Sequence, residues 1–492
     1  MRYLFALAVA LVTVSMAAPT AATASPTAPA VSVQGHQIVD ADGNPLRLRG
    51  VNRSGSEYAC VQGWGFFDGP VDASTLTLIA SWGSNAVRVP LNAQCWLNIN
   101  GVPAAYSGQA YRDQIRDFVD RINAAGMVAI VDLHWNAPGT TIAYSQQVMA
   151  DADHAPAFWA SVAATFADYP SVAFDLYNEP HDISWACWRD GCRTNEGWEA
   201  AGMQDLVDAV RATGATNLVI ASGLNWAGDL SEWILHAPVD PLDNLAAGVH
   251  IYSFSQCNTE SCWNSTIGDV AKTYPVVSTE IGEDTCTGTF TSTYMTWADA
   301  NGVGYLPWAW NTADCRSGPS LITNYNGTPT TYGAAVRAHM TGLAAGTTLY
   351  GFGSLRQSWV STASITSGKY AHMGRRSMQV SKQLVPSKRA RAFTHNDNEP
   401  VDPSNGSALT AWIRLDPRSV SGAWKGRLTM RDESGRWVNG PAVQLRRGQW
   451  TPVTYSPAAS VWQDNSGIGV RVVGSTGSDG RLFFQVDSVT QN

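Results

Sequence analysis

Eight short apolar segments, rich in β-branched residues, recur between residues 46 and 308. They cover residues 46–51, 85–90, 127–134, 172–178, 217–222, 246–252, 275–280 and 303–308. Amphipathic stretches separate them, such as Tyr111 to Ala125, where Ile115, Phe118, Val119 and Ile122 recur at helical spacing. This alternation predicts repeated βα units.

Eight such units with continuously apolar strands favour a closed parallel (β/α)8 TIM barrel. Strands buried on both faces read as apolar runs, whereas strands with one face in water alternate. A doubly wound open sheet is the rival fold. No glycine-rich phosphate loop follows the first strand segment, which counts against that rival.

The pattern changes after about residue 345. Short β-type runs, among them 377–384, 408–415 and 481–489, are separated by Gly, Pro, Asp and Ser. This spacing predicts an all-β jelly-roll sandwich. Residues 345–492 hold 18 Lys and Arg against 9 Asp and Glu, a charge of +9, so the whole-chain charge of −8 leaves −17 for residues 1–344. The prediction is a catalytic barrel at 25–343, a linker at 344–348 and a sandwich domain at 349–492.

Residues 1–24 have the features of an export signal. Arg2 precedes an apolar run, and Ala22-Thr23-Ala24 forms a small-residue cleavage site. The apolar run is too short for a membrane span, so we expect a secreted, extracellular protein with no membrane partner.

The eight cysteines fit an oxidising compartment, where disulfides persist. Close spacing suggests two local bridges and leaves two further pairs, giving Cys187–Cys192, Cys257–Cys262, Cys60–Cys95 and Cys286–Cys315. Eight cysteines allow 105 pairings, so other connectivities stay open. Zinc is the competing use, but the Cys-x4-Cys spacings lack a matching His pattern, and we expect no metal and no cofactor.

Chemistry in a barrel of this kind lies at the carboxyl ends of the strands. The residues that close the eight segments are Asn52, Arg88, His134, Asn178, Glu179, His250, Tyr252, Glu280 and Trp308. A single strand-end Glu is more often a surface carboxylate, and a single His more often satisfies a backbone carbonyl. Two carboxylates accompanied by Arg, His, Tyr and Trp at equivalent depths favour a catalytic site over these structural roles.

Glu179 and Glu280, on the fourth and seventh segments, suit the cleavage of a glycosidic bond. One carboxyl must be protonated to assist the leaving oxygen, and the other must be ionised to meet the developing positive charge. Opposed strands can hold the two groups about 5–5.5 Å apart, the separation of a retaining mechanism.

The segment Val172 to His181, VAFDLYNEPH, resembles the signature of glycoside hydrolase family 5, which includes many cellulases. The resemblance covers roughly residues 33–342. It implies that Glu179 is the acid/base and Glu280 the nucleophile. The family commonly has Gly-Glu-Phe-Gly at the nucleophile, whereas this chain has Thr279-Glu280-Ile281-Gly282 followed by Glu283, which makes Glu283 the alternate nucleophile.

The same resemblance assigns roles to the neighbouring residues. Asn178 would donate to the sugar 2-hydroxyl, and Tyr252 and Arg88 would hold Glu280 ionised. His250 and His134 would orient the network and the substrate hydroxyls. Aromatic rings would stack on the sugars at Trp308, Trp135 and Trp226.

The resemblance is nearest to the endo-β-1,4-glucanase branch, with β-mannanase or β-1,3-glucanase activity as the alternative. The C-terminal segment looks like a carbohydrate-binding module, so the expected partner is a polysaccharide. We expect a monomer that binds no nucleic acid. The alternative class is a polysaccharide-binding protein without catalysis, which the presence of both Glu179 and Glu280 disfavours.

Overall fold

The computed structural model describes residues 28–314, 318–345, 347–350, 360–361, 364–368, 377–384, 391–396, 408–432, 436–457, 467–474 and 480–491. The expected signal peptide, residues 1–24, lies outside this part of the chain. Within it, no helix has both the length and the apolar composition needed to cross a bilayer.

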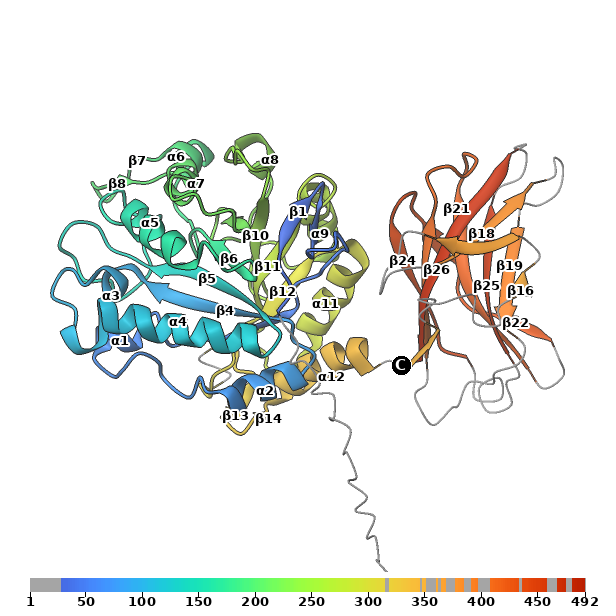
Figure 1. Ribbon diagram of the computed structural model, residues 1–492, viewed down its shortest axis with the longest axis horizontal. Coiled ribbons are helices and arrows are strands. Elements are labelled where there is room, and N and C mark those ends of the chain that lie inside the picture. The colour runs from blue at the N-terminus through green and yellow to red at the C-terminus, as the bar shows by residue number, and fades with distance from the viewer. Residues whose placement is uncertain are drawn as a thin grey trace, which may run out of the picture.

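A parallel eight-stranded sheet forms the first part of the molecule (Figure 1). Its strands, neighbours in this order, are β3 (Gly50–Asn52), β4 (Ala86–Asn92), β5 (Val128–Trp135), β6 (Val172–Asp175), β9 (Val219–Ser222), β10 (Leu245–Tyr252), β11 (Val276–Gly282) and β12 (Gly304–Pro307). Each corresponds to one predicted segment. A parallel bridge between Arg49 and Tyr305 joins the first strand segment to the last. This closure confirms the TIM barrel and excludes the open sheet.

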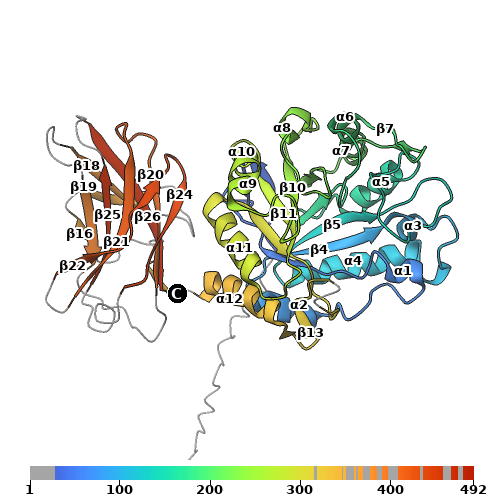
Figure 2. The same cartoon turned by 180° about the vertical axis from the view of Figure 1, so that it is seen from behind.

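Helices surround the sheet, as Figures 1 and 2 show from opposite sides. They are α1 (Ala59–Gln62), α2 (Ala73–Ser81), α3 (Ala93–Leu97), η1 (Ala104–Tyr106), α4 (Gln109–Ala124), α5 (Ala155–Phe166), α6 (Trp185–Asp190), α7 (Met203–Arg211), α8 (Trp233–His236), α9 (Glu260–Ser265), α10 (Ile267–Val270), α11 (Thr289–Asn301) and α12 (Thr331–Ala345). The predicted helix at 111–125 is α4, and it buries Ile115, Phe118, Val119 and Ile122. Three- and four-residue spacing places these side chains on one face, which packs on the sheet.

Short antiparallel pairs lie outside the main sheet: β1 (Ser32–Gln34) with β2 (Gln37–Val39), β7 (Cys192–Arg193) with β8 (Glu199–Ala200), and β13 (Ile322–Asn324) with β14 (Thr328–Pro329). Val31 and Ile38, beside and within the β1–β2 hairpin, join one apolar cluster with buried side chains of the barrel strands.

Four barrel strands each carry a residue of that apolar cluster and, two positions later, a buried polar residue. Ala86, Ile130, Ala173 and Ile220 belong to the apolar cluster. Two residues further along the same strands are the buried polar residues Arg88, Asp132, Asp175 and Ser222. Side chains two apart in a strand point to the same face, so the polar layer lies directly above the apolar floor.

The C-terminal segment forms two antiparallel sheets, as the sandwich prediction requires. One contains β15 (Thr347–Tyr350), β17 (Ser364–Gly368), β18 (Ser377–Gln383), β20 (Leu409–Leu415), β24 (Trp450–Tyr455) and β26 (Arg481–Gln491). The other contains β16 (Val360–Ser361), β19 (Arg391–Asn396), β21 (Trp424–Arg431), β22 (Trp437–Asn439), β23 (Val443–Leu445) and β25 (Gly467–Gly474). Their apolar core begins at Met378 and shares no member with the barrel cores.

Three of the expected disulfides are present: Cys60–Cys95, Cys187–Cys192 and Cys257–Cys262. Cys286 is also disulfide-bonded. Its expected partner, Cys315, lies outside the described residues. All three confirmed bridges cross-link segments that follow barrel strands in the chain.

Candidate active site

Glu179 and Glu280 lie close together at the carboxyl ends of β6 and β11. His250, on β10, brings its Nδ1 to 2.7 Å from Glu179 Oε1 and 3.7 Å from Glu280 Oε2. One oxygen of each carboxyl and one ring nitrogen of His250 all lie within 4.8 Å of one another. Strand β6 ends at Asp175, earlier than the predicted residue 178, so Glu179 belongs to the loop that follows.

Two donors hold the Glu280 carboxylate. The Tyr252 hydroxyl donates to Oε2 at 2.6 Å, and Arg88 Nη1 donates to Oε1 at 2.8 Å. Burial and the neighbouring Glu280 raise the pKa of Tyr252 well above its ordinary value, so the phenol keeps the proton that it donates. With one donor on each oxygen, the Glu280 carboxyl group is held in one orientation.

Arg88 links Glu280 to the floor of the site. Its guanidinium is fully buried, and it donates to Asp175 at 2.9 Å and to Asn178 Oδ1 at 2.9 Å, and lies 3.0 Å from Asp132 Oδ2. Burial lowers the pKa of Arg88, but the surrounding carboxylates outweigh it and raise the value above normal. A buried cation with this many partners is fixed in one orientation.

The two buried aspartates have perturbed acidities. Burial raises the pKa of both Asp132 and Asp175 to about 7, even though Arg88 opposes the shift. Asp132 Oδ2 also lies 2.7 Å from His134 Nδ1. These two carboxyls therefore set the position of Arg88 and His134 beneath the reacting groups.

Both histidines of the site are neutral above acidic pH. Burial lowers the pKa of His250 to about 3 and that of His134 to about 4. A neutral His250 can accept a hydrogen bond from protonated Glu179 at Nδ1, while Nε2–H donates to Thr279 Oγ1 at 3.1 Å. His134 stacks on Trp308, with ring centroids 5.5 Å apart and planes 11° from parallel.

Glu179 differs from Glu280 in its surroundings. Burial raises its pKa, and His134, Gln146 and Arg88 offset the effect only in part. A carboxyl with a raised pKa keeps its proton to higher pH than an ordinary glutamate. The pair therefore has one carboxyl suited to donate a proton and one held by two hydrogen-bond donors.

Glu283, the alternate nucleophile, has a structural role. Its Oε1 accepts from the backbone N–H of Thr287 at 2.8 Å and of Gly288 at 2.6 Å, and its Oε2 accepts from Thr291 N–H at 3.0 Å. Burial raises the pKa of Glu283, but these hydrogen bonds outweigh it and the value lies below normal. Glu283 thus satisfies the first turn of α11, which favours Glu280 as the reacting group.

Three further expected site residues are Asn178, Trp135 and Trp226. The Asn178 side-chain amide donates to Gln146 Oε1 at 2.9 Å. Trp135 packs against Tyr58, with ring centroids 6.2 Å apart. Trp226 is 52% exposed and stacks on His181 at 3.6 Å. Among the described side chains, neither tryptophan donates a hydrogen bond to the two carboxyls.

Sequence reasoning missed Asp132, Asp175 and Gln146. A signal for the aspartates exists, because a carboxylate inside an apolar barrel strand must be paired. Each also lies two residues beyond an apolar floor residue, Ile130 or Ala173. Gln146 comes from a loop, and nothing in the local pattern indicates that it reaches Asn178.

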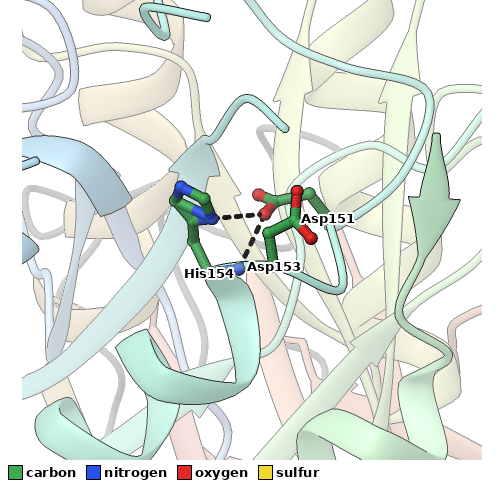
Figure 3. Close-up of side chains that lie close together, drawn as sticks. All are labelled: Asp151, Asp153 and His154. Carbon is green, nitrogen blue, oxygen red and sulfur yellow. Dashed lines mark hydrogen bonds and ion pairs between the residues drawn. The ribbon is translucent and has the colours of Figure 1, made fainter. Parts of the chain in front are cut away.

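Two groups in the described part of the chain place three metal-ligand atoms close together: the Glu179, His250 and Glu280 set, and Asp151 with Asp153 and His154 (Figure 3). In the second group, Asp151 Oδ1 accepts from His154 N–H at 2.8 Å, and Asn136 donates to Asp151 Oδ2 at 2.6 Å. Asp153 accepts from Gly139 N–H at 2.9 Å. These hydrogen bonds hold the turn that leads into α5.

The model of the cellulase family, glycosyl hydrolase family 5, matches residues 39–314. Endoglucanase E-5 of Thermobifida fusca is 24% identical over 265 residues, 52% of this chain and 49% of that protein. Mannan endo-1,4-beta-mannosidase of Streptomyces lividans is 23% identical over 309 residues, 60% of this chain and 70% of that protein. The chain thus spans about half the length of the first of these relatives.

Among solved structures, the native form of beta-glucanase SdGluc5_26A from Saccharophagus degradans aligns with a TM-score of 0.51 and 22% identity. The alignment covers 67% of this chain and 98% of that one. This likeness supports the barrel fold.

Proposed function

Because the chain belongs to the cellulase family, glycosyl hydrolase family 5, we propose that it is a retaining β-glycoside hydrolase, an endo-β-1,4-glucanase. The observation that carries the proposal is the approach of Glu179 and Glu280, whose oxygens lie within 4.8 Å. An inverting enzyme separates its carboxyls by about 6.5–9.5 Å to leave room for water. The shorter separation supports a direct attack by one carboxylate.

In the first step, Glu280 attacks the anomeric carbon and forms a glycosyl ester. The bond to the leaving oxygen breaks, and Glu179 transfers its proton to that oxygen. Arg88 and Tyr252 hold the attacking carboxylate in line, which is the positioning that such a step requires.

In the second step, Glu179 is ionised and takes a proton from water. The water oxygen attacks the anomeric carbon, and Glu280 leaves as a carboxylate. Each step inverts the configuration of the anomeric carbon, so the two steps together restore the β configuration. Asn178, held by Arg88 and Gln146, is placed to meet the sugar 2-hydroxyl where charge develops.

The substrate proposal is β-1,4-glucan, with β-mannan as the second candidate. Endoglucanases are among the relatives, as is a mannan endo-1,4-beta-mannosidase. A β-1,3-glucanase remains an alternative from the sequence alone. A binding protein without catalysis is less well supported, because both carboxyls keep the partners that catalysis needs.

We also propose that the protein is secreted as a monomer. The disulfides favour an oxidising compartment, and residues 1–24 have the composition of an export signal. The predicted domains, 25–343 and 349–492 with a linker at 344–348, are supported by separate apolar cores. The linker residues include the end of α12 and the start of β15.

A reducing-sugar assay on soluble β-glucan, mannan, xyloglucan and laminarin tests the substrate proposal. The greatest kcat/KM is expected on the mixed-linkage or β-1,4-glucan, and a preference for mannan or laminarin would replace the glucan proposal with the alternative substrate.

A chain ending at Ala345 keeps the whole of α12 and the barrel cores. We expect it to match the full chain on soluble glucan and to lose activity on insoluble cellulose, because tethering by the sandwich is removed. Equal loss on soluble glucan would show that the sandwich completes the site.

A further inference from the structure

A pocket of about 440 Å³ lies between two loops that follow barrel strands. It lies between the loop after β6, which continues into α6, and the loop after β9, which continues into α8; these two helices are neighbours in both views (Figures 1 and 2). Its volume falls within the range of small-molecule sites, about 300–1,000 Å³. None of the groups assigned to catalysis lines it.

One wall of the pocket is a rigid aromatic platform. Trp185 is half-buried and meets the edge of Trp188 at 5.2 Å, and His236 stacks near it at 6.0 Å with planes 17° apart. Trp188 is fully buried and donates to Ser222 O at 2.9 Å. The Cys187–Cys192 disulfide fixes the same short helix. A ring held this way can receive the apolar face of a sugar with little loss of side-chain entropy.

The pocket lining also offers hydrogen-bond acceptors. Asp229 accepts from Ser231 N–H at 2.8 Å and from Asn225 Nδ2 at 3.1 Å, and Glu232 lies 3.5 Å from His236. An ionised carboxylate has about four acceptor sites, so each acid can still accept from hydroxyls. A pocket lined by an aromatic ring and by carboxylates suits a neutral, hydroxyl-rich sugar and disfavours an acidic polysaccharide.

A turn with an unusual backbone connects this pocket to the candidate active site. Asn225, Trp226 and Ala227 have φ values of 54°, 61° and 54°, three successive left-handed residues without a glycine. Such a conformation is costly and persists only where the surroundings impose it. Here Trp226 N–H donates to Pro180 O at 3.0 Å, and His250 N–H donates to Ala227 O at 2.9 Å.

This turn links the loop that carries Glu179 to the pocket. Pro180 follows the proposed acid Glu179, the exposed Trp226 stacks on His181, and Asn225 lines the pocket. A general acid lies beside the leaving oxygen, and the hydrogen bond from Trp226 N–H to Pro180 O holds the turn against the loop that carries the acid. We propose that the pocket is a distal subsite that binds the leaving-group end of a neutral β-glucan, with a sugar ring on Trp185 and its hydroxyls on Asp229 and Glu232.

This inference rests on the proposed function, and substrate length separates the two. Cleavage of 4-nitrophenyl β-cellobioside releases nitrophenol, which is too short to reach the pocket, whereas hydroxyethyl cellulose extends beyond it. Trp185→Ala and the Asp229→Asn, Glu232→Gln double variant are expected to lower kcat/KM on hydroxyethyl cellulose about tenfold. Both should stay within about twofold of the parent protein on the nitrophenyl substrate.

Leu235→Ala is the matched control, because Leu235 is 80% exposed on α8 and does not line the pocket. It should behave as the parent protein on both substrates. Unchanged kinetics on hydroxyethyl cellulose, or an equal loss on both substrates by the double variant, would overturn the proposal. If the parent protein cleaved neither substrate, the proposed function would be wrong. Calorimetry with cellohexaose would then test whether the pocket binds glucan. Weaker binding by Trp185→Ala than by the parent protein supports the pocket as a glucan site, and equal binding refutes it.

Discussion

Replacing Glu280 with Gln is expected to lower kcat on soluble β-1,4-glucan by at least about 10³-fold, because the attacking carboxylate is lost. Gln keeps the shape of the side chain and can still meet Tyr252 and Arg88. Arg88 also retains Asp132 and Asp175, so its buried charge stays compensated. The protein should therefore remain folded, which a melting curve checks alongside the initial rates.

Glu283→Gln is the informative companion variant. Glu283 accepts three backbone N–H groups near the start of α11, so its replacement should lower the melting temperature by about 2–4 °C, as loss of a helix cap does. Activity per folded molecule should stay near that of the parent protein. The reverse pattern, an active Glu280→Gln and an inactive Glu283→Gln, would transfer the nucleophile role to Glu283.

Glu179→Gln is expected to lower kcat on β-glucan about 10²–10⁴-fold, the usual contribution of a general acid. The loss should be much smaller on 2,4-dinitrophenyl β-cellobioside, because dinitrophenolate leaves without a proton. Equal losses on both substrates would contradict the acid role. Glu199→Gln, which changes an exposed carboxylate, is the control and should leave both rates unchanged.

The pH dependence follows from the acidity of Glu179. The acid must be protonated in the first step, so kcat/KM falls as pH rises through its pKa. Burial raises that pKa, which moves the fall to higher pH than an ordinary Glu, near about 4.3, would give. In Glu179→Gln this alkaline limb should be lost, and its persistence would assign the limb to another group.

Much of the barrel could be predicted because its strands are buried on both faces. That burial forces continuous apolar runs, and each of the eight runs corresponds to a strand. The predicted strand ends differ from those in the structure: the strand predicted at 172–178 ends at Asp175. Residues 176 to 179 continue to approach neighbouring strands, with Asn178 N–H donating to Leu133 O at 3.1 Å, without forming a regular ladder.

Local sequence patterns could not predict the contacts of the buried aspartates or the pocket beside Trp185, because both depend on residues far apart in the chain. Asp132 and Asp175 lie within predicted strands, and only the structure shows that Arg88 contacts both. The pocket beside Trp185 arises from two loops about 40 residues apart in the chain. Trp188 is fully buried beside the Cys187–Cys192 disulfide.

The tryptophans of the sandwich differ in their burial. Trp424 and Trp412 are buried in it, whereas Trp437 and Trp450 are partly exposed. Trp359 and Trp462 lie outside the described residues. The basic charge of this segment therefore remains the main sequence feature that bears on its ligand.

The first-formed product of cellohexaose hydrolysis tests the central claim most directly. Proton NMR, recorded within the first minutes, follows the anomeric signals of the new reducing end before mutarotation mixes them. Attack by Glu280 followed by water predicts that the β-anomer forms first and that the α-anomer grows only later. First formation of the α-anomer would contradict the two-step mechanism and the roles assigned to Glu179 and Glu280.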